Sequence, residues 1–271
     1  PISGTTPAGT NPEGAHVGSG LDWNTKLGVP QYRTQSDNLN APEATCNITS
    51  LAMSLERMGY GREDAMTAID KQLREQYLEQ QRAELKRKKG DLSTLPKDQS
   101  EVQLPDGYYQ SQVKDYLKAQ NAAAGKPYQG LRGKKTDDKF WDAASQRFHD
   151  EAQFEDSLDF LRHLTHAGSR TDLDTITPKL LEKIEPDPDK RPTYRTITPG
   201  RNMDWTQARG QTQGVLDDGG AAMLSFYHKG GHNRADSHII SMQNLTQDGF
   251  VADDPYGGAR TDYNVDEAGD A

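Results

Sequence analysis

Helical and strand patterns occupy different parts of this sequence, and this separation restricts the possible folds more than any other feature. Apolar residues recur at helical spacing from about residue 46 to residue 184. Short apolar runs typical of buried strands come later, at 221–227, 237–242 and 249–252. Helices first and strands together afterwards favour an α+β fold with a small antiparallel sheet. Between the two parts, we predict a strand at 194–198 and a helix at 205–216.

The two ends of the chain differ from its middle. Residues 1–20 are mostly Gly, Pro, Ser and Thr and offer almost nothing to bury, so we predict a disordered linker or tail. Residues 263–271 are predicted to form a flexible C-terminal tail. Residues 21–262 are enough for a single large domain, which is the organisation that we expect.

Charge and composition exclude several classes of function. The chain has a net charge of -9 and a pI of about 5.3, which makes it a poor ligand for nucleic acid phosphates or anionic membranes. No apolar run approaches the length that spans a bilayer. One cysteine permits neither an internal disulfide nor a zinc site with several thiolates. We therefore expect no nucleic acid partner, no membrane, no metal and no cofactor.

The one cysteine, Cys46, is placed where a helix begins. It follows a polar loop at 35–44, and apolar residues at helical spacing follow it as far as Met58. A thiol in the first turn of a helix faces backbone N–H groups and the positive end of the helix dipole, and both favour the reactive thiolate. A lone cysteine is often just a small buried apolar residue, and the pattern around Cys46 alone leaves that alternative open.

A reactive cysteine needs a base and a third group that holds the base. Among seven histidines, His238 is the candidate because it opens an apolar strand directly after a polar loop. Asp254 ends the next apolar run, and the hairpin between them is short enough to bring the two together. We expect the oxyanion donors to be the Cys46 backbone N–H and the Gln35 amide, with Gln31 as the second choice. A strand-end histidine and a turn-capping aspartate are the structural alternatives.

Short motifs around these residues resemble those of papain-like cysteine peptidases of the double-glycine leader peptidase type. That family shows Val-Pro, then Gln, then Cys-Gly-Pro-Thr-Ser leading into a helix, and later a His that opens an apolar strand and an Asn-Asp-Pro-type turn. Similar strings stand here in the same order: Val29-Pro30-Gln31-Tyr32-Arg33-Thr34-Gln35, Thr45-Cys46-Asn47-Ile48-Thr49-Ser50, Gly219-Gly220-Ala221-Ala222-Met223-Leu224, His238-Ile239-Ile240-Ser241-Met242 and Asp253-Asp254-Pro255-Tyr256-Gly257. The resemblance covers residues 27–60 and 200–262.

The resemblance implies a papain-like fold, in which a helix that carries the cysteine packs on a small antiparallel sheet. It implies Cys46 as the nucleophile, His238 as the base, Asp254 as the orienting carboxylate and Gln35 as the oxyanion donor. These are the same four residues that the local patterns select.

The sequence departs from the family in two places. Asn47-Ile48 replaces the usual Gly-Pro after the cysteine, which puts the local turn in doubt. The stretch from about 61 to 199 is far longer than the family connection, and we interpret it as a helical insertion within the single domain at 21–262. We expect this insertion to shape substrate access or to bind a partner protein.

These expectations favour a thiol hydrolase that cleaves amide bonds of a peptide or protein through a thioester. Two alternatives use the same chemistry: an amidase that cuts peptide cross-links of the bacterial cell wall, and a deamidating or acyl-transfer toxin. The Gly/Pro/Thr-rich start of the chain is typical of a module tethered to another module, so a secreted or delivered bacterial protein is the expected setting.

Two alternatives come from other classes of protein. The papain-like frame could serve as an inactive binding module, and the Asn47-Ile48 departure favours that hypothesis. His228, His232 and His238 could instead converge on zinc, although the glycines at 230–231 argue against a helix that would align them.

Overall fold

A computed structural model describes residues 32–39, 42–124, 138–168, 172–197, 205–227, 237–246 and 249–264. Within these ranges the helices come first: α2 (Cys46–Arg57), α3 (Arg62–Lys88), α4 (Tyr108–Ala124), α5 (Asp138–Glu151), α6 (Phe154–Leu164), α7 (Leu173–Ile184) and α8 (Trp205–Asp217). The strands follow: β1 (Ala222–Tyr227), β2 (Ser237–Leu245), β3 (Gly249–Asp254) and β4 (Gly258–Asn264). Short 3-10 turns are η2 (Gln35–Asp37), η3 (Leu92–Thr94) and η4 (Gln99–Glu101). The predicted α+β class is confirmed.

The four strands form one antiparallel sheet in the order β1-β2-β3-β4, so each strand pairs with the next along the chain. β4 was not among the predicted strands, and it extends through Asn264, two residues into the segment expected to be a tail. The strand predicted at 194–198 is wrong for residues 194–197, which form no regular structure; Thr198 lies outside the described residues. Tyr194 and Thr196 instead donate their hydroxyls to the Asp174 carboxylate, so α7 takes the place of a partner strand.

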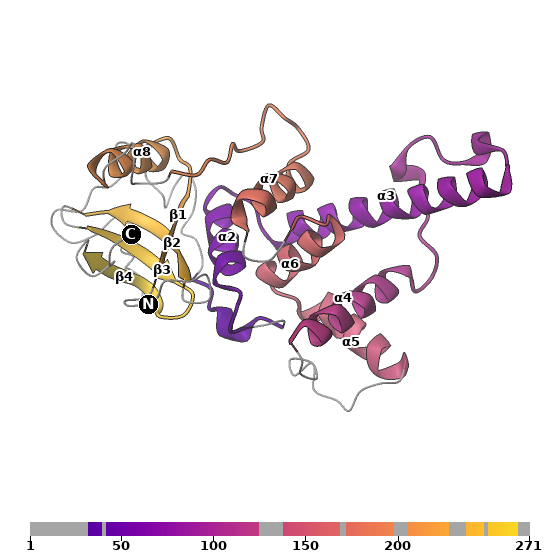
Figure 1. Cartoon of the computed structure of the whole chain (residues 1–271), viewed down its shortest axis with the longest axis horizontal. Helices are drawn as coiled ribbons and strands as arrows, with labels where there is room; N and C mark the ends of the chain where they lie inside the picture. Colours follow the sequence, from indigo (N-terminus) through magenta and orange to yellow (C-terminus); the bar gives the residue numbers. More distant parts are fainter. Residues whose placement is uncertain are drawn as a thin grey trace.

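Helix α2 lies between the sheet and helices α3 to α7, whereas α8 packs on the sheet (Figure 1). Its apolar side, which includes Ile48, Leu51 and Leu55, belongs to the core of the helical part. Its opposite side carries Ser50 and Ser54, which are also buried because they face β2. A helix buried on both sides can keep a polar face only where that face is hydrogen-bonded.

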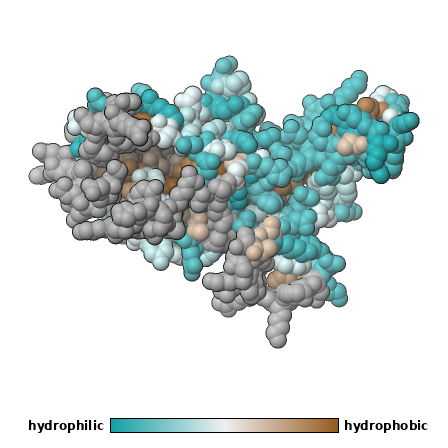
Figure 2. Space-filling model, in the orientation of Figure 1, coloured by the Kyte–Doolittle hydropathy of each residue, from teal (hydrophilic) through white to brown (hydrophobic). Residues whose placement is uncertain are grey.

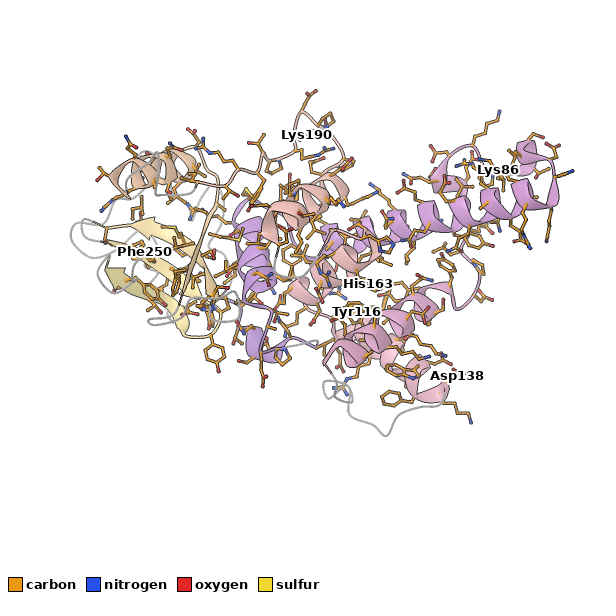
Figure 3. All side chains as sticks on the ribbon, in the orientation of Figure 1. Lys86, Tyr116, Asp138, His163, Lys190 and Phe250 are labelled. Carbon is orange, nitrogen blue, oxygen red and sulfur yellow. The ribbon has the colours of Figure 1, made fainter. Side chains whose placement is uncertain are left out.

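The apolar interior is divided into two clusters. The larger one joins side chains of α2 to α7, and the smaller one joins the sheet to Leu216 of α8. Tyr116 and Phe250 are fully buried in the larger and the smaller cluster respectively, and both are labelled in Figure 3. The sheet and the helical part therefore each have their own core, and α2 is the element that joins them.

Helix α3 is the longest of the described helices, and its second half extends away from the other α-helices, with the segment that contains η3 and η4 beside it (Figure 1). The N–H of Gly61 donates to the Asp64 carboxylate at its start (2.7 Å), and Lys89 ends it in the left-handed conformation with φ of 53°. Cationic residues fill its last turn, which suits the negative end of the helix dipole. In Figure 2 the surface of this extension is mostly hydrophilic.

Across the ranges that the structure describes, no helix is both long enough and apolar enough to cross a lipid bilayer.

Candidate active site

Helix α2 and strand β2 run in the same direction and are joined by polar contacts. Three α2 side chains, each about one turn from the next, bind alternate residues of β2: Ser50 Oγ donates to Ile239 O (2.8 Å), Ser54 Oγ shares a hydrogen bond with Ser241 Oγ (3.2 Å), and Arg57 Nη1 donates to Gln243 O (3.0 Å). Cys46 lies one turn before Ser50, and His238 directly precedes Ile239. The alignment therefore brings the start of the helix and the start of the strand to the same end of the contact.

Cys46 is the first residue of α2 and is partly exposed, whereas most of the helix after it is buried. Its side chain thus faces the positive end of the helix dipole and remains accessible. Thr45, the residue before it, makes no side-chain cap on the helix and instead accepts a hydrogen bond from Asn38 Nδ2 (2.7 Å). The alternative of a cysteine enclosed in the core does not fit this placement.

His238 connects Cys46 to Asp254. Its Nε2 is 2.6 Å from Asp254 Oδ1, and the Cys46 side chain lies close enough to the ring to raise its pKa. Burial lowers the pKa of His238, but the interactions with Asp254 and Cys46 outweigh it and raise the pKa to about 9. At neutral pH the ring is therefore an imidazolium, which can stabilise a thiolate on Cys46.

The raised pKa of His238 predicts a pH limit for any reaction in which this ring donates a proton. Below about pH 9 the imidazolium holds that proton, and above it the proton is lost. For any such reaction we expect kcat/KM to fall above about pH 9, by roughly tenfold for each further pH unit. Initial rates between about pH 6 and pH 11 measure this limit, with circular dichroism to show that the chain remains folded. A rate that stays constant to pH 11 would contradict the assignment.

Asp254 ends β3 and is the most strongly held side chain of the three. The β2–β3 register pairs Ser241 with Asp253, so the next residue shares a face of the sheet with His238. Burial raises the pKa of Asp254, but hydrogen bonds from His238, from Tyr263 and from the backbone of the following turn outweigh it and hold that pKa well below its usual range. Asp254 is therefore an anion throughout the pH range in which proteins are usually studied.

The turn after Asp254 requires glycine at position 257. A Cβ at Gly257 would lie 2.6 Å from Asp254 Oδ2 and 3.0 Å from its Cγ, whereas a Cβ at Gly258 would meet only Thr261 Oγ1, at 3.8 Å. Only glycine lets the chain pass this close to the carboxylate. The Asp-Pro-Tyr-Gly string is thus explained by the approach of the backbone to Asp254.

This close approach predicts a difference between two neighbouring glycine variants. Gly257→Ala should displace the Asp254 carboxylate and lower the rate of any reaction that uses His238 by about tenfold or more, because the carboxylate no longer holds the ring. Gly258→Ala should leave the rate within about twofold, since its Cβ has room. Parallel rate and thermal unfolding measurements separate this effect from simple instability. Equal rates for the two variants would show that the contact at Gly257 is unimportant.

Gln35, the predicted oxyanion donor, is buried in the loop that precedes α2. Its backbone N–H donates to Pro255 O (3.0 Å), which ties this loop to the turn after Asp254. One hydrogen of its side-chain amide goes to Pro42 O (2.8 Å), so the second amide hydrogen is the one that could serve an oxyanion. Gln31, the second choice for this role, lies outside the described residues.

The helical segment at 61–199 holds the same loop, which the sequence did not predict. Both carboxylate oxygens of Asp156, in the first turn of α6, accept from Leu39 N (3.0 and 2.9 Å). Arg33 bridges Glu155 of α6 and Glu56 of α2, at 3.2 Å each. The helical segment at 61–199 therefore helps to fix the residues that precede Cys46. In the sequence, the one sign of these contacts is the acidic first turn of α6. Acidic first turns are common in helices, so this sign does not identify the loop as a partner.

The alternative of a zinc site receives no support from the described part of the chain. His228 and His232 lie outside it, and within it no three His, Cys, Asp or Glu side chains are grouped so that they could hold a metal ion. His238 is hydrogen-bonded to Asp254 and interacts with Cys46.

The structure thus brings Cys46, His238 and Asp254 together: His238 is hydrogen-bonded to Asp254 and interacts with Cys46, and Gln35 lies on a loop that is bonded to the turn after Asp254. Tyr32 and Tyr263 also touch Asp254 and were not selected from the sequence. In comparisons with known proteins, no family model matches the chain, and neither a curated protein nor a solved structure matches it significantly.

Proposed function

We propose that this protein is a thiol hydrolase that cleaves amide bonds with Cys46 as the nucleophile. The observation that carries the proposal is the position of the His238 ring, which is hydrogen-bonded to Asp254 and interacts with Cys46. A sulfur at a helix start, an imidazolium beside it and an anion behind it together meet the requirements of nucleophilic catalysis by cysteine. The partial exposure of Cys46 adds to this support because a substrate must reach it.

The first half of the reaction forms a thioester. The Cys46 thiolate attacks the amide carbonyl carbon, a C–S bond forms, and the carbonyl electrons move to oxygen. As the tetrahedral oxyanion collapses, the C–N bond breaks and the leaving amine takes the proton from His238 Nδ1. Asp254 keeps the ring in place through Nε2 and stabilises its positive charge before the transfer.

The second half releases the product. Neutral His238 takes a proton from water, and the hydroxide attacks the thioester carbon. The C–S bond breaks, the carboxylic acid leaves, and the thiolate and imidazolium are restored. During both halves the oxyanion accepts hydrogen bonds from the Cys46 backbone N–H and, in this proposal, from the second amide hydrogen of Gln35.

The papain-like frame is part of the proposal. The order of a cysteine helix followed by a sheet that carries histidine and aspartate supports it, and so does the packing of α2 along β2. The proposed substrate is a peptide, within a protein or within a cell-wall cross-link. The hydrogen-bonded histidine favours a catalytic protein over an inactive binding module. Binding alone does not require an imidazolium beside an accessible thiol.

A panel of substrates tests the proposal directly. Peptide mixtures and peptidoglycan fragments are incubated with the intact protein, and new amines and carboxylates are detected by mass spectrometry. Cleavage accompanied by a thioester that hydroxylamine releases from Cys46 would support the hydrolase. A panel without any cleavage, together with a Cys46 that iodoacetamide modifies no faster than free cysteine, would overturn it.

A further inference from the structure

We propose that Tyr263 is a positioning residue of this site, whose hydroxyl fixes one oxygen of Asp254 and thereby aims the other oxygen at His238. The catalytic consequence rests on the proposed function, whereas the structural role of Tyr263 does not. The role concerns a residue of β4, the one strand that sequence patterns did not predict.

The fold places Tyr263 beside Asp254. In the β3–β4 register Tyr263 is opposite Phe250, and Phe250 shares a face of the sheet with Asp254 four residues later. The Tyr263 ring stacks on the ring of Phe250, with centroids 5.3 Å apart and an interplanar angle of 18°. Because Phe250 is fully buried, it gives the tyrosine ring a rigid support.

The two oxygens of Asp254 are divided between different partners. Oδ1 accepts from His238 Nε2 (2.6 Å) and from the backbone N–H of Tyr256 (2.8 Å), and Oδ2 accepts from the Tyr263 hydroxyl (2.7 Å). A carboxylate with bonds on both oxygens cannot rotate about its Cβ–Cγ bond without breaking one of them. Tyr263 therefore fixes the direction in which Asp254 meets His238.

Tyr263 also shares the negative charge of Asp254. Burial raises the pKa of Tyr263, and its bond to the anion raises it further, so the hydroxyl remains a donor at every relevant pH. The groups around the carboxylate are His238 from β2, Tyr263 from β4, the backbone N–H groups of Tyr256 and Gly257, and the hydroxyl of Tyr32, which binds the Asp254 backbone oxygen. With one donor fewer, Asp254 would attract the His238 proton more strongly.

A second tyrosine provides a matched control. Tyr32 also donates its hydroxyl to Asp254, but to the backbone oxygen (3.0 Å) and not to the carboxylate. Tyr32→Phe and Tyr263→Phe therefore each remove one hydroxyl that touches the same residue. Only Tyr263→Phe changes the carboxylate, and it retains the ring that stacks on Phe250.

The experiment compares both variants by proton NMR of the histidine ring and by kinetics. We expect Tyr263→Phe to move the low-field Nε2–H signal of His238 and to raise its titration midpoint, and to lower kcat by about tenfold at unchanged KM. Tyr32→Phe, which leaves the bond between Tyr263 and the carboxylate in place, should change the signal, the midpoint and kcat less than Tyr263→Phe does. 3,5-Difluorotyrosine at position 263 is a stronger hydrogen-bond donor and should lower the midpoint instead. Because this variant keeps the hydroxyl, it tests the positioning role even if Tyr263→Phe does not fold.

The outcomes separate this inference from the proposed function. An unchanged signal, midpoint and kcat in Tyr263→Phe, or equal changes in both variants, would overturn the positioning role even if the protein hydrolyses amides. A larger midpoint shift in Tyr263→Phe than in Tyr32→Phe, in a protein that cleaves no amide, would retain the positioning role and remove the proposed function.

Discussion

Replacing Cys46 with alanine is expected to lower amide hydrolysis by at least about 10⁴-fold, because the sulfur that forms the thioester is gone. The fold should not change. Cys46 is partly exposed at the first position of α2, and alanine is a good helix former there. We expect the free energy of unfolding to stay within about 1 kcal/mol of the wild-type value.

The measurement is the initial rate on the best substrate of the panel, with unfolding followed by circular dichroism. Cys46→Ser is the control, since it keeps a similar shape and a much weaker nucleophile, and it should also lose at least about a thousandfold in rate. A Cys46→Ala protein that hydrolyses at the wild-type rate would end the thiol mechanism, whatever the geometry around His238.

Replacing Arg33 with alanine is expected to lower the free energy of unfolding by about 3 kcal/mol. Arg33 binds Glu155, whose side chain is completely buried, and its guanidinium also lies over the ring of Phe154 at 5.6 Å. Without Arg33, the Glu155 anion would be buried without its cation, and the two parts of the chain that they join would separate more easily. The loop that carries Gln35 should then lose its fixed position, and activity should fall with stability.

The destabilisation caused by Arg33→Ala should depend on pH. Burial raises the pKa of Glu155, an effect that Arg33 only partly offsets, so removal of Arg33 should raise it further. A carboxyl whose pKa is higher in the folded chain stabilises the fold at low pH and loses that contribution as pH rises through the folded-state value. Arg33→Ala should therefore be less destabilised at about pH 5 than at about pH 8.

Urea unfolding at both pH values measures this prediction. Adding Glu155→Gln to Arg33→Ala removes the buried charge and should recover a large part of the lost stability. If Arg33→Ala unfolds like the wild type at about pH 8, the bridge to Glu155 contributes little, and apolar contacts and the bond from Leu39 to Asp156 hold the helical segment in place.

The sequence predicted those features that depend on neighbouring residues. Helical spacing after Cys46 and the apolar runs that contain His238 and Val251 are local patterns, and the structure has a helix and two strands there. β4 was missed because its residues, Gly258 to Asn264, include few apolar side chains. The strand is formed by pairing with β3 more than by its own pattern.

Contacts between distant residues could not be predicted in the same way. Leu39 and Asp156 are 117 positions apart, and nothing beside either residue indicates the other. The meeting of Cys46 with His238 was expected only because the chemistry of a thiol requires a base, and because the motifs resemble those of a known family. The segment at 194–197 has strand-forming residues but no strand beside it, so its propensity had no effect.

The contact between α2 and β2 determines how early during synthesis the protein can fold. Ser50 and Ser54 bind residues that are made 189 and 187 positions later, so a ribosome adds most of the chain before their partners exist. Until then no sheet covers the polar side of α2, and Cys46 is not yet beside His238. The contact between α2 and β2 cannot form until β2 has been made, and folding that depends on such distant pairing is slow.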